Sequence, residues 1–287
     1  MAVRPVFIAM NTPPYRTVWN AEFVYNKGLA VSQKQKNITA VHNVFRTHFS
    51  TQNVLEISSK SLQDGGISLS AFHLLKYVPS IGKSIPVENI FQGGKVFKNG
   101  GPYTDLYHCS SREAKGDERL QNSGALTGFY FEGQEYPLKP LTAFYNYIYI
   151  SALRENPELA KIALAYDAFT DIEFNPNRSL NCQAEAAALF VSLTRLGLID
   201  RINSFDEFLH ILLPSQKSPV HTVPSTTAPM QTPKAVPSLK IGDIVIHKLW
   251  GKGIVAAVND TVATVSFESV GEKKLGIAWI LQNCEQS

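Results

Sequence analysis

The sequence predicts an α+β protein with a predominantly helical large domain, residues 1–212, and a small all-β domain, residues 239–287. Three observations support this prediction. Apolar residues recur at helical spacing in several segments of the first 212 residues, with short strand-like runs between them. Residues 213–238 contain six prolines with many Ser and Thr, which is typical of an extended, semi-rigid linker. Beyond this linker, short runs of alternating apolar and polar residues are separated by glycines.

The composition is that of a globular protein, because the 287 residues are 44% hydrophobic and carry a net charge of only +3. This mildly basic balance neither requires nor excludes a nucleic-acid partner. Three widely spaced cysteines, Cys109, Cys182 and Cys284, argue against a disulfide framework and against a cysteine-based zinc site. The N-terminus lacks the apolar run of a signal peptide, and no stretch reaches the length of a membrane span. We therefore expect a cytoplasmic protein with no membrane contact.

Basic residues border two of the elements expected in the first part of the chain, which begins with a strand at 4–10. Lys34 and Lys36 precede a predicted helix at 38–49, and the N-terminus of a helix can bind phosphate. Lys60 lies in a polar cluster that follows a predicted strand at 54–57. The alternative is that these lysines are solvated and bind no ligand.

The chain is organised around the segment 84–97, where a helix is predicted to begin. Ser84 is a suitable N-cap, Pro86 suits the first helical turn, and the carboxylate of Glu88 favours the positive end of the helix dipole. With a period of 3.6 residues, Glu88, Gln92 and Lys95 share one stripe of this helix. The pattern therefore places an acid, an amide and an amine in one row.

Two glycines, Gly93 and Gly94, interrupt this predicted helix. Each costs roughly 1 kcal/mol in a helix interior relative to alanine, so we expect a ligand or another backbone segment to pass close to them. Two interpretations of the polar row remain open. It is either a solvated row on an amphipathic helix or a partly enclosed functional site.

The remaining elements of the large domain are expected as a capped helix start at 110–113, a hairpin with strands at 126–131 and 136–138, and helices at 142–153, 157–165, 183–196 and 205–213. The helix at 142–153 is rich in aromatic residues. We expect these rings to lie in the core rather than to stack on nucleic-acid bases, because aromatic residues at helical spacing are usually buried.

Three carboxylates are concentrated in residues 167–176. If this segment is extended, Asp167, Asp171 and Glu173 lie on one face, and repulsion between the like charges raises the pKa of one of them. Such a group could serve as a general acid. The alternative is that these carboxylates cap and tie down neighbouring loops.

The small domain is predicted from four alternating segments, at 243–248, 253–258, 262–267 and 273–277. With glycines at the turns, these segments indicate a five-stranded SH3-like β-barrel that is separate from the large domain. A domain of about 50 residues is marginal but viable by itself.

Four motifs together resemble the NADAR family, also called YbiA-like. Residues 69–72 are similar to its Phe/Leu-Ser-Asn-Phe pattern, and residues 88–96 to its Glu-His-x-x-Gln-x-x-Lys-Phe helix. Residues 171–175 resemble its Asp-x-x-Trp-Gly motif, and residues 181–184 its Asn-x-Leu-Gly helix start. The chain departs from this pattern in having Asn89 in place of His, Ala71 in place of Asn, and Phe174-Asn175 in place of Trp-Gly.

More closely, the chain is similar to the NADAR subgroup encoded beside DarT-type DNA ADP-ribosyltransferase toxins. The similarity lies in the segments Gln-Lys-Gln-Lys-Asn-Ile, Ile-Ser-Ser-Lys-Ser, Gly-Gly-Pro-Tyr-Thr-Asp-Leu and Phe-Thr-Asp-Ile-Glu-Phe-Asn-Pro, and it covers residues 1–210. It implies a NADAR-like catalytic domain that hydrolyses the N-glycosidic bond between ADP-ribose and guanine in DNA. ADP-ribosylated DNA is then the substrate, and a DarT-type toxin encoded nearby is the protein that this antitoxin opposes.

The resemblance also implies roles for individual residues. Glu88 is the acid or base, and Lys95 either holds a phosphate or forms a Schiff base with the opened sugar. Asp171 orients Lys95 or the ribose hydroxyls. The other residues expected to bind substrate are Lys34, Lys36 and Lys60, which would contact the pyrophosphate or the DNA backbone, and Ser70, Phe72, Gln92, Asp105, Glu173 and Asn181.

No cofactor is expected, and no metal, since His42 and His48 form no ligand pattern with an acid. The segments 242–248 and 250–255 resemble the Tudor-like C-terminal domain of UvrD-type helicases, which implies docking to a protein or nucleic-acid partner. Two other functions remain open. One is a non-catalytic antitoxin or DNA-binding adaptor that neutralises its partner by contact, and the other is an N-glycosidase acting on a riboflavin-pathway intermediate.

Overall fold

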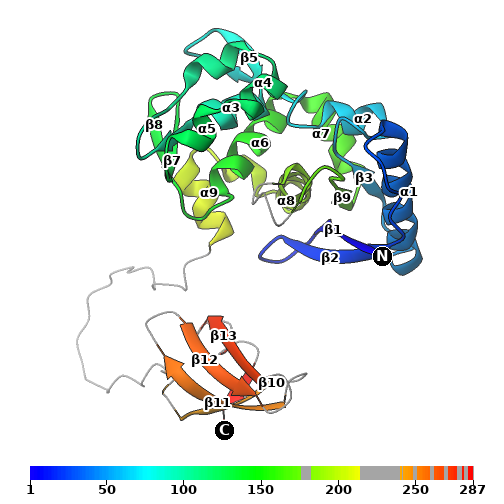
Figure 1. Ribbon diagram of the computed structural model, residues 1–287, viewed down its shortest axis with the longest axis vertical. Coiled ribbons are helices and arrows are strands. Elements are labelled where there is room, and N and C mark those ends of the chain that lie inside the picture. Colours follow the sequence, from blue (N-terminus) through cyan, green and yellow to red (C-terminus); the bar gives the residue numbers. More distant parts are fainter. Residues whose placement is uncertain are drawn as a thin grey trace, which may run out of the picture. The chain divides into compact units, whose positions relative to one another are not determined.

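The computed structural model describes residues 1–175, 182–213, 240, 242–247, 251–258, 262–267, 271–276, 280 and 284–286. The chain divides into two compact units, Met1–Pro219 and Val220–Ser287 (Figure 1). The predicted linker at 213–238 lies almost entirely outside the described residues.

A four-stranded sheet forms one side of the larger unit, with the strand order β2-β1-β9-β3. Its strands are β1 (Ala2–Ala9), β2 (Arg16–Phe23), β3 (Val54–Glu56) and β9 (Ala168–Thr170). β1 pairs antiparallel with β2 and β9, whereas β3 runs parallel to β9. Because β3 and β9 are parallel, the residues that follow both strands emerge at the same edge of the sheet.

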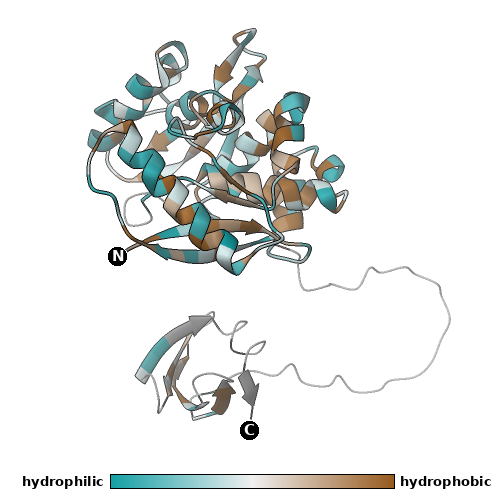
Figure 2. Ribbon diagram, turned by 90° about the vertical axis from the view of Figure 1, so that its right-hand side faces the viewer, coloured by the Kyte–Doolittle hydropathy of each residue, from teal (hydrophilic) through white to brown (hydrophobic). Residues whose placement is uncertain are grey.

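The two faces of this sheet bury different residues, as the two-residue period of a strand requires. Val6, Val54 and Ala168 face the long helix α1 (Val31–His48), where they pack with Val41 and Phe45. The alternate residues of the same strands, Phe7, Leu55 and Phe169, belong to the main core of the unit. The outward face of α1 is largely hydrophilic, which is consistent with a helix that covers one side of the sheet (Figure 2).

The main core is built by helices and two small sheets (Figure 1). The helices are α2 (Asp64–Ser68), α3 (Val87–Gly93), α4 (Ser111–Gly116), α5 (Arg119–Asn122), α6 (Ala143–Glu155), α7 (Pro157–Leu164), α8 (Gln183–Arg195), α9 (Phe205–Leu212) and the 3-10 helices η1 (Thr104–His108) and η2 (Ile199–Arg201). The small sheets pair β4 (Leu75–Val78) with β5 (Lys83–Pro86), and β6 (Lys95–Phe97) with β7 (Leu126–Phe131) and β8 (Gln134–Pro137).

Most of the predicted elements of the larger unit are confirmed. The hairpin β7–β8, the capped start of α4 and the helices α6 to α9 lie where the sequence predicts them, to within about two residues. The aromatic residues of α6 are core residues: Phe144 stacks on Phe129 with ring centroids 4.6 Å apart, and Tyr149 is fully buried. The prediction that this helix is buried is therefore correct.

The helix expected to run through 84–97 is shorter than predicted. It is α3, which begins at Val87 and ends at Gly93, so Ser84 lies on β5 and Lys95 begins β6. The two glycines at its end lie where a side chain would not fit. A Cβ on Gly93 would lie 2.5 Å from the ring of Tyr107, and one on Gly94 would lie 2.8 Å from the carbonyl oxygen of Tyr130. Neighbouring chain segments, rather than a ligand, make the close approach that the sequence predicted.

The first helix is longer than predicted. It begins at Val31, so Lys34 and Lys36 lie within α1 and do not precede it. The sequence Ser-Gln-Lys-Gln-Lys reads as a polar lead-in, but lysine and glutamine are good helix formers and extend the helix by two turns. The amide of Lys34 donates to the carbonyl of Ala30, so it is used within the helix rather than presented to a phosphate.

The smaller unit contains an antiparallel sheet with the strand order β13-β12-β11-β10-β14. Its strands are β10 (Ile244–His247), β11 (Gly251–Val258), β12 (Val262–Phe267), β13 (Gly271–Gly276) and β14 (Cys284–Gln286). Val245, Val255 and Val265 are among the residues that form its small core. Among the described residues the two edge strands do not pair with each other, so the sheet is open and the closed SH3-like barrel stays a prediction.

Within the described ranges, no helix combines the length and the apolar character needed to cross a membrane.

A buried histidine makes the stability of the larger unit depend on pH. Burial, assisted by the charge of Arg46, lowers the pKa of His42 from 6.5 to about 4, and its Nε2 lies 2.9 Å from Oγ1 of Thr170. The unfolded chain therefore binds a proton at pH values where the folded protein does not. We expect the contribution of His42 to the free energy of unfolding to be complete above pH 6.5 and to fall by on the order of 3 kcal/mol toward pH 4.

The measurement is urea unfolding of wild type and His42→Gln at pH 7 and pH 4.5. The comparison isolates this residue because glutamine can hydrogen-bond Thr170 but does not titrate. The wild type should lose more stability than the variant between the two pH values. Equal losses of stability would show that His42 does not take up a proton on unfolding between these two pH values.

Candidate active site

Glu88 lies in the first turn of α3 and is only 6% exposed. Its backbone N–H donates to the carbonyl oxygen of Ala71 at 2.9 Å, which ties the helix start to the loop at 69–72. Its side chain is one turn before that of Gln92, as the i, i+4 spacing requires, and Nε2 of Gln92 donates to Oε1 of Glu88 at 2.9 Å. A carboxylate at the start of a helix is also favoured by the helix dipole.

Lys95 continues this row from the first position of β6. Its Nζ donates to Oε1 of Gln92 at 2.6 Å and lies 4.8 Å from the ring centroid of Phe91. Burial lowers the pKa of Lys95 from 10.5 to about 8, against the opposing charge of Glu88. The predicted row of acid, amide and amine is therefore present, although a strand and not the helix supplies its third member.

A second cation, which the sequence analysis missed, joins this row from α4. Nζ of Lys115 lies 3.6 Å from Oε1 of Glu88 and 5.3 Å from the ring centroid of Phe72. The side chain of Lys115 is 61% exposed, whereas Lys95 is half-buried. The capping box of Ser110 and Glu113 predicts the start of α4, but the side of α4 that meets α3 is set by tertiary packing.

Asp171 follows β9 and is held by three N–H donors. Its Oδ1 accepts from the backbone N–H groups of Glu173 at 3.0 Å and Phe174 at 3.2 Å, and its Oδ2 accepts from Nε2 of Gln183 at 3.0 Å. Burial is the largest cause that raises the pKa of Asp171 from 3.8 to about 8, and the nearby charge of Glu56 is the second. The carboxyl group therefore holds a proton over much of the neutral range.

Glu56, the last residue of β3, is the second residue that the sequence analysis missed. It is 2% exposed and accepts hydrogen bonds from Ser58 Oγ at 2.7 Å, Thr170 Oγ1 at 2.6 Å and the N–H of Ile172 at 2.8 Å. Burial raises its pKa, and these three donors oppose the rise. Because Glu56 lies within a short apolar strand, the sequence pattern around it is that of a core position. The parallel pairing of β3 with β9 brings it toward the turn that contains Asp171.

Asp167, Asp171 and Glu173 do not share one face, so that prediction is wrong. β9 ends at Thr170 and the chain turns there, which breaks the two-residue period. Asp167 accepts from the N–H of Asn53 and pairs with Arg195, and Glu173 lies at the surface with Lys34 Nζ 3.4 Å from its Oε1. The sequence predicts that repulsion raises the pKa of one of these three groups. In the structure the pKa of Asp171 is raised, chiefly by burial and next by the charge of Glu56.

Asp171 and Glu88 are linked by hydrogen bonds through Gln183 and Ala71, and both act electrostatically on Tyr145 of α6. Burial raises the pKa of this tyrosine well above its ordinary value, and the charges of Glu88 and Asp171 add to the rise. Lys115 likewise acts electrostatically on both Lys95 and Asp171. The site therefore combines α3, β6, α4 and the turn after β9.

Other residues predicted to bind substrate lie at various distances from this cluster. Phe72 is at the cluster through its contact with Lys115. The hydroxyl of Ser70 donates to the carbonyl of Ile67 at 2.7 Å and lies 2.8 Å from Nδ1 of His73, so it stabilises its own loop. Asp105 is 62% exposed and pairs with Arg119, apart from the Glu88 row.

The remaining predicted lysines are not directed at the cluster by any described contact. Lys36 is exposed on α1, and Nζ of Lys60 donates to the hydroxyl of Ser59. Asn181 lies outside the described residues. Asn89, which replaces the histidine of the related pattern, is completely buried: its amide donates to the carbonyls of Leu106 and Cys109, so here it holds η1 against α3.

A family model described as DarT1-associated NADAR antitoxin matches residues 2–222. The chain belongs to this family. The matched range contains every residue of the cluster described above, and it ends before the five-stranded sheet of the smaller unit. No curated protein matches the sequence.

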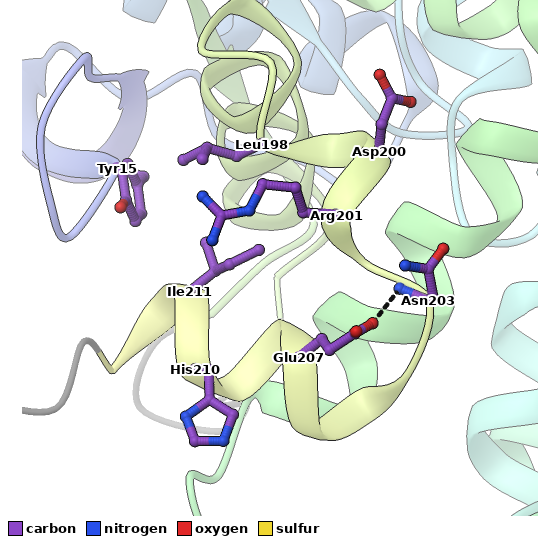
Figure 3. A pocket seen from close by; sticks show the side chains of 8 residues that line it. All are labelled: Tyr15, Leu198, Asp200, Arg201, Asn203, Glu207, His210 and Ile211. Carbon is purple, nitrogen blue, oxygen red and sulfur yellow. Dashed lines mark hydrogen bonds between the residues drawn. The ribbon is translucent and has the colours of Figure 1, made fainter. Parts of the chain in front are cut away.

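In this NADAR protein a separate hollow of about 580 Å³ lies beside α9 and η2 (Figure 3). Arg201 extends between Leu198 and Ile211 on the side of Tyr15, while Glu207 accepts a hydrogen bond from the N–H of Asn203 at 2.7 Å. None of the residues predicted to act on substrate lines this hollow. Within the part of the NADAR chain that the structure describes, no group of three or more His, Cys, Asp or Glu side chains is placed to hold a metal ion.

The raised pKa of Asp171 leads to a test of stability against pH. Between about pH 4 and pH 8 the folded protein holds a proton on Asp171 that the unfolded chain has released, so this group lowers the free energy of unfolding as pH rises. Asp171→Asn does not titrate. We expect the stability of the variant relative to wild type to increase from pH 5 to pH 8.5 by more than about 1 kcal/mol, the equivalent of one pKa unit.

Urea unfolding at the two pH values measures this difference. Asp105→Asn is the control, because it removes an exposed carboxylate, and it should not reproduce the increase. A constant difference between Asp171→Asn and wild type over this range would mean that Asp171 is already ionised near pH 5.

Proposed function

We propose that this NADAR protein is an ADP-ribosyl glycohydrolase that hydrolyses the N-glycosidic bond between ADP-ribose and guanine in DNA, and that it acts in this way as the antitoxin of a DarT-type toxin. The observation that carries the proposal is the hydrogen-bonded row of Glu88, Gln92 and Lys95, of which the first two are buried and the third half-buried, in a chain of the DarT1-associated NADAR family. The row is enclosed, which argues against the interpretation as a solvated surface stripe.

The chemistry of the bond matches this set of groups. Cleavage of an N-glycosidic bond develops positive charge on the ribose, which an anion stabilises, and the leaving base needs a proton. In the proposed mechanism Glu88 is the anion and acid/base group at the sugar, because it is a buried carboxylate with hydrogen-bonded orientation. Asp171 carries a proton at neutral pH and serves as a second proton source or holds the ribose hydroxyls.

The pKa of Lys95 supports a covalent role for this residue. With a pKa of about 8, roughly a tenth of its amine is neutral at pH 7 and can act as a nucleophile. In the proposed step the amine nitrogen forms a bond to the anomeric carbon, and guanine leaves with the electron pair of the C–N bond and receives a proton from an acid of the site. The bond between the anomeric carbon and the ring oxygen then breaks, the ring oxygen takes up the proton lost by the amine nitrogen, and a Schiff base forms. Water hydrolyses this Schiff base to free ADP-ribose and the amine.

Substrate binding is proposed to extend from this row to the surface. Lys115 and Phe72 stand beside Glu88 and offer a cation and an aromatic ring to an anionic nucleotide. Lys34, Lys36 and Lys60 remain proposed contacts to phosphate, and Ser70, Gln92, Asp105, Glu173 and Asn181 remain proposed substrate residues. The smaller unit is proposed to be a Tudor-like docking module for a protein or nucleic-acid partner.

Substitution of Glu88 tests the function directly. Glu88→Gln retains an oxygen that can accept from Gln92, but it removes the carboxylate. We expect release of ADP-ribose from DNA that carries ADP-ribose on guanine to fall at least about 100-fold, as is usual for a general acid or base. The control is Glu135→Gln, which changes an exposed acid on β8 and should leave release unchanged.

The assay contains no toxin protein, so it also separates catalysis from neutralisation by contact. Wild-type release that requires Glu88 supports the glycohydrolase. Failure of the folded wild type to release ADP-ribose, together with binding of a DarT-type toxin, would favour the contact antitoxin instead.

Reductive trapping tests the role of Lys95. Cyanoborohydride reduces a Schiff base to a stable amine, so wild type incubated with ADP-ribosylated DNA should retain ADP-ribose on Lys95, as located by mass spectrometry. Lys95→Arg should lose both the adduct and turnover, whereas Lys83→Arg, an exposed lysine on β5, should keep both. Turnover without an adduct, and its persistence in Lys95→Arg, would assign Lys95 to phosphate binding.

A further inference from the structure

The side chain of Gln183, the first residue of α8, connects three segments of the site. Its Oε1 accepts from the N–H of Ala71 at 2.7 Å, and its Nε2 donates to the carbonyl of Ile57 at 2.7 Å and to Oδ2 of Asp171 at 3.0 Å. One side-chain amide is thus hydrogen-bonded to three segments: the residue after β3, the loop at 69–72 and the turn after β9.

These contacts leave the amide one orientation. If the side chain were turned by 180°, its NH₂ group would face the N–H of Ala71 and its oxygen would face the carbonyl oxygen of Ile57. An amide with one acceptor bond and two donor bonds has little freedom to reorient.

The peptide at Ala71 carries the connection onward to Glu88. The N–H of Ala71 is bound by Gln183, and its carbonyl oxygen accepts from the N–H of Glu88 at 2.9 Å. Gln183 therefore donates to Asp171 and also holds the loop at 69–72, to which the start of the Glu88 helix is hydrogen-bonded.

We propose that Gln183 is a positioning residue that sets the orientation of Asp171 and its separation from Glu88. This inference rests on the proposed function, since it assumes that both carboxyl groups act on one substrate. Gln183 itself does not contact the reacting atoms in this role. Its side chain differs from the leucine at the corresponding place of the Asn-x-Leu-Gly pattern, so the assignment concerns this chain and not that pattern.

Several titratable or hydrogen-bonding groups besides Gln183 interact with the carboxyl group of Asp171. They are Glu56 on β3, Glu173 in the same turn, Lys115 on α4, Tyr145 and Tyr149 on α6, and Cys182 before α8. Burial raises the pKa of both tyrosines and of the cysteine, so these three are neutral near pH 7. Glu56 favours the protonated form of Asp171, whereas Lys115 and the amide of Gln183 favour the ionised form.

The test has a readout that does not depend on turnover. In protein labelled with ¹³C at aspartate carboxyl groups, the Asp171 resonance is identified by its loss in Asp171→Asn, and its titration is followed by NMR. In Gln183→Met the N–H donor to the ionised form is missing, so the midpoint should rise by on the order of one pH unit. In the same variant kcat should fall about ten- to a hundredfold, while KM changes little.

Gln183→Glu is the second variant, and it covers the case in which Gln183→Met does not fold. The introduced carboxyl group can still accept from Ala71, but when ionised it repels Asp171 and cannot donate to Ile57. Activity should therefore be restored toward acidic pH, where the introduced group is protonated, and should fall more steeply than wild type as pH rises.

Ser192→Ala is the matched control within α8. It removes the bond from the N–H of Met10 at 2.9 Å and the bond to the carbonyl of Ala188 at 3.0 Å without touching Asp171. It should lower the melting temperature and leave both the titration and the pH profile unchanged. An unchanged Asp171 midpoint in folded Gln183→Met, or a shift of equal size in Ser192→Ala, would overturn the proposal. If wild type releases no ADP-ribose, the proposed function fails, whereas the NMR titration still decides the contact with Gln183.

Discussion

The structure of the larger unit depends on two carboxyl groups at one edge of the four-stranded sheet, the buried Glu56 and the half-buried Asp171. Two acids taken from water at adjacent positions are costly unless each finds donors or keeps a proton. Both carboxyl groups find such donors. Glu56 receives three hydrogen bonds and Asp171 receives three, and five of the six donors come from the turn after β9 and the residues next to it or from the start of α8.

This arrangement explains why the site is assembled from segments far apart in the sequence. The parallel pairing of β3 with β9 brings Glu56 to Thr170 and Ile172. Helix α8 then closes the edge with its first side chain, and the loop at 69–72 connects the same corner to the start of α3. The Glu88 row is consequently oriented by contacts that also hold Asp171, so the two halves of the site are not independent.

The sequence predicts the local parts of this site and not their assembly. The spacing of Glu88 and Gln92 within a helix is a property of local geometry, and their hydrogen bond follows from it. Lys95 joins the row despite the end of α3 at Gly93, because the backbone of β6 carries its side chain back over Phe91. Glu56 and Lys115 were missed because an acid in an apolar strand and a lysine on a short surface helix have no distinctive pattern. Their roles depend on the pairing of β3 with β9 and the packing of α4 on α3.

Burial shifts the pKa values of Lys95 and Asp171 in opposite directions and thereby brings them close together. The ordinary pKa values of a lysine and an aspartic acid, 10.5 and 3.8, are more than six pH units apart, yet in this site both are about 8. Desolvation disfavours the charged form of each group, so it lowers the pKa of the amine and raises that of the acid. A neutral amine and a protonated acid then coexist at a pH where neither would normally be found. Chemistry that needs a nucleophile and a proton donor together can use this state, although the hydrogen bonds from Glu173 and Gln183 to Asp171 oppose it by favouring the ionised acid.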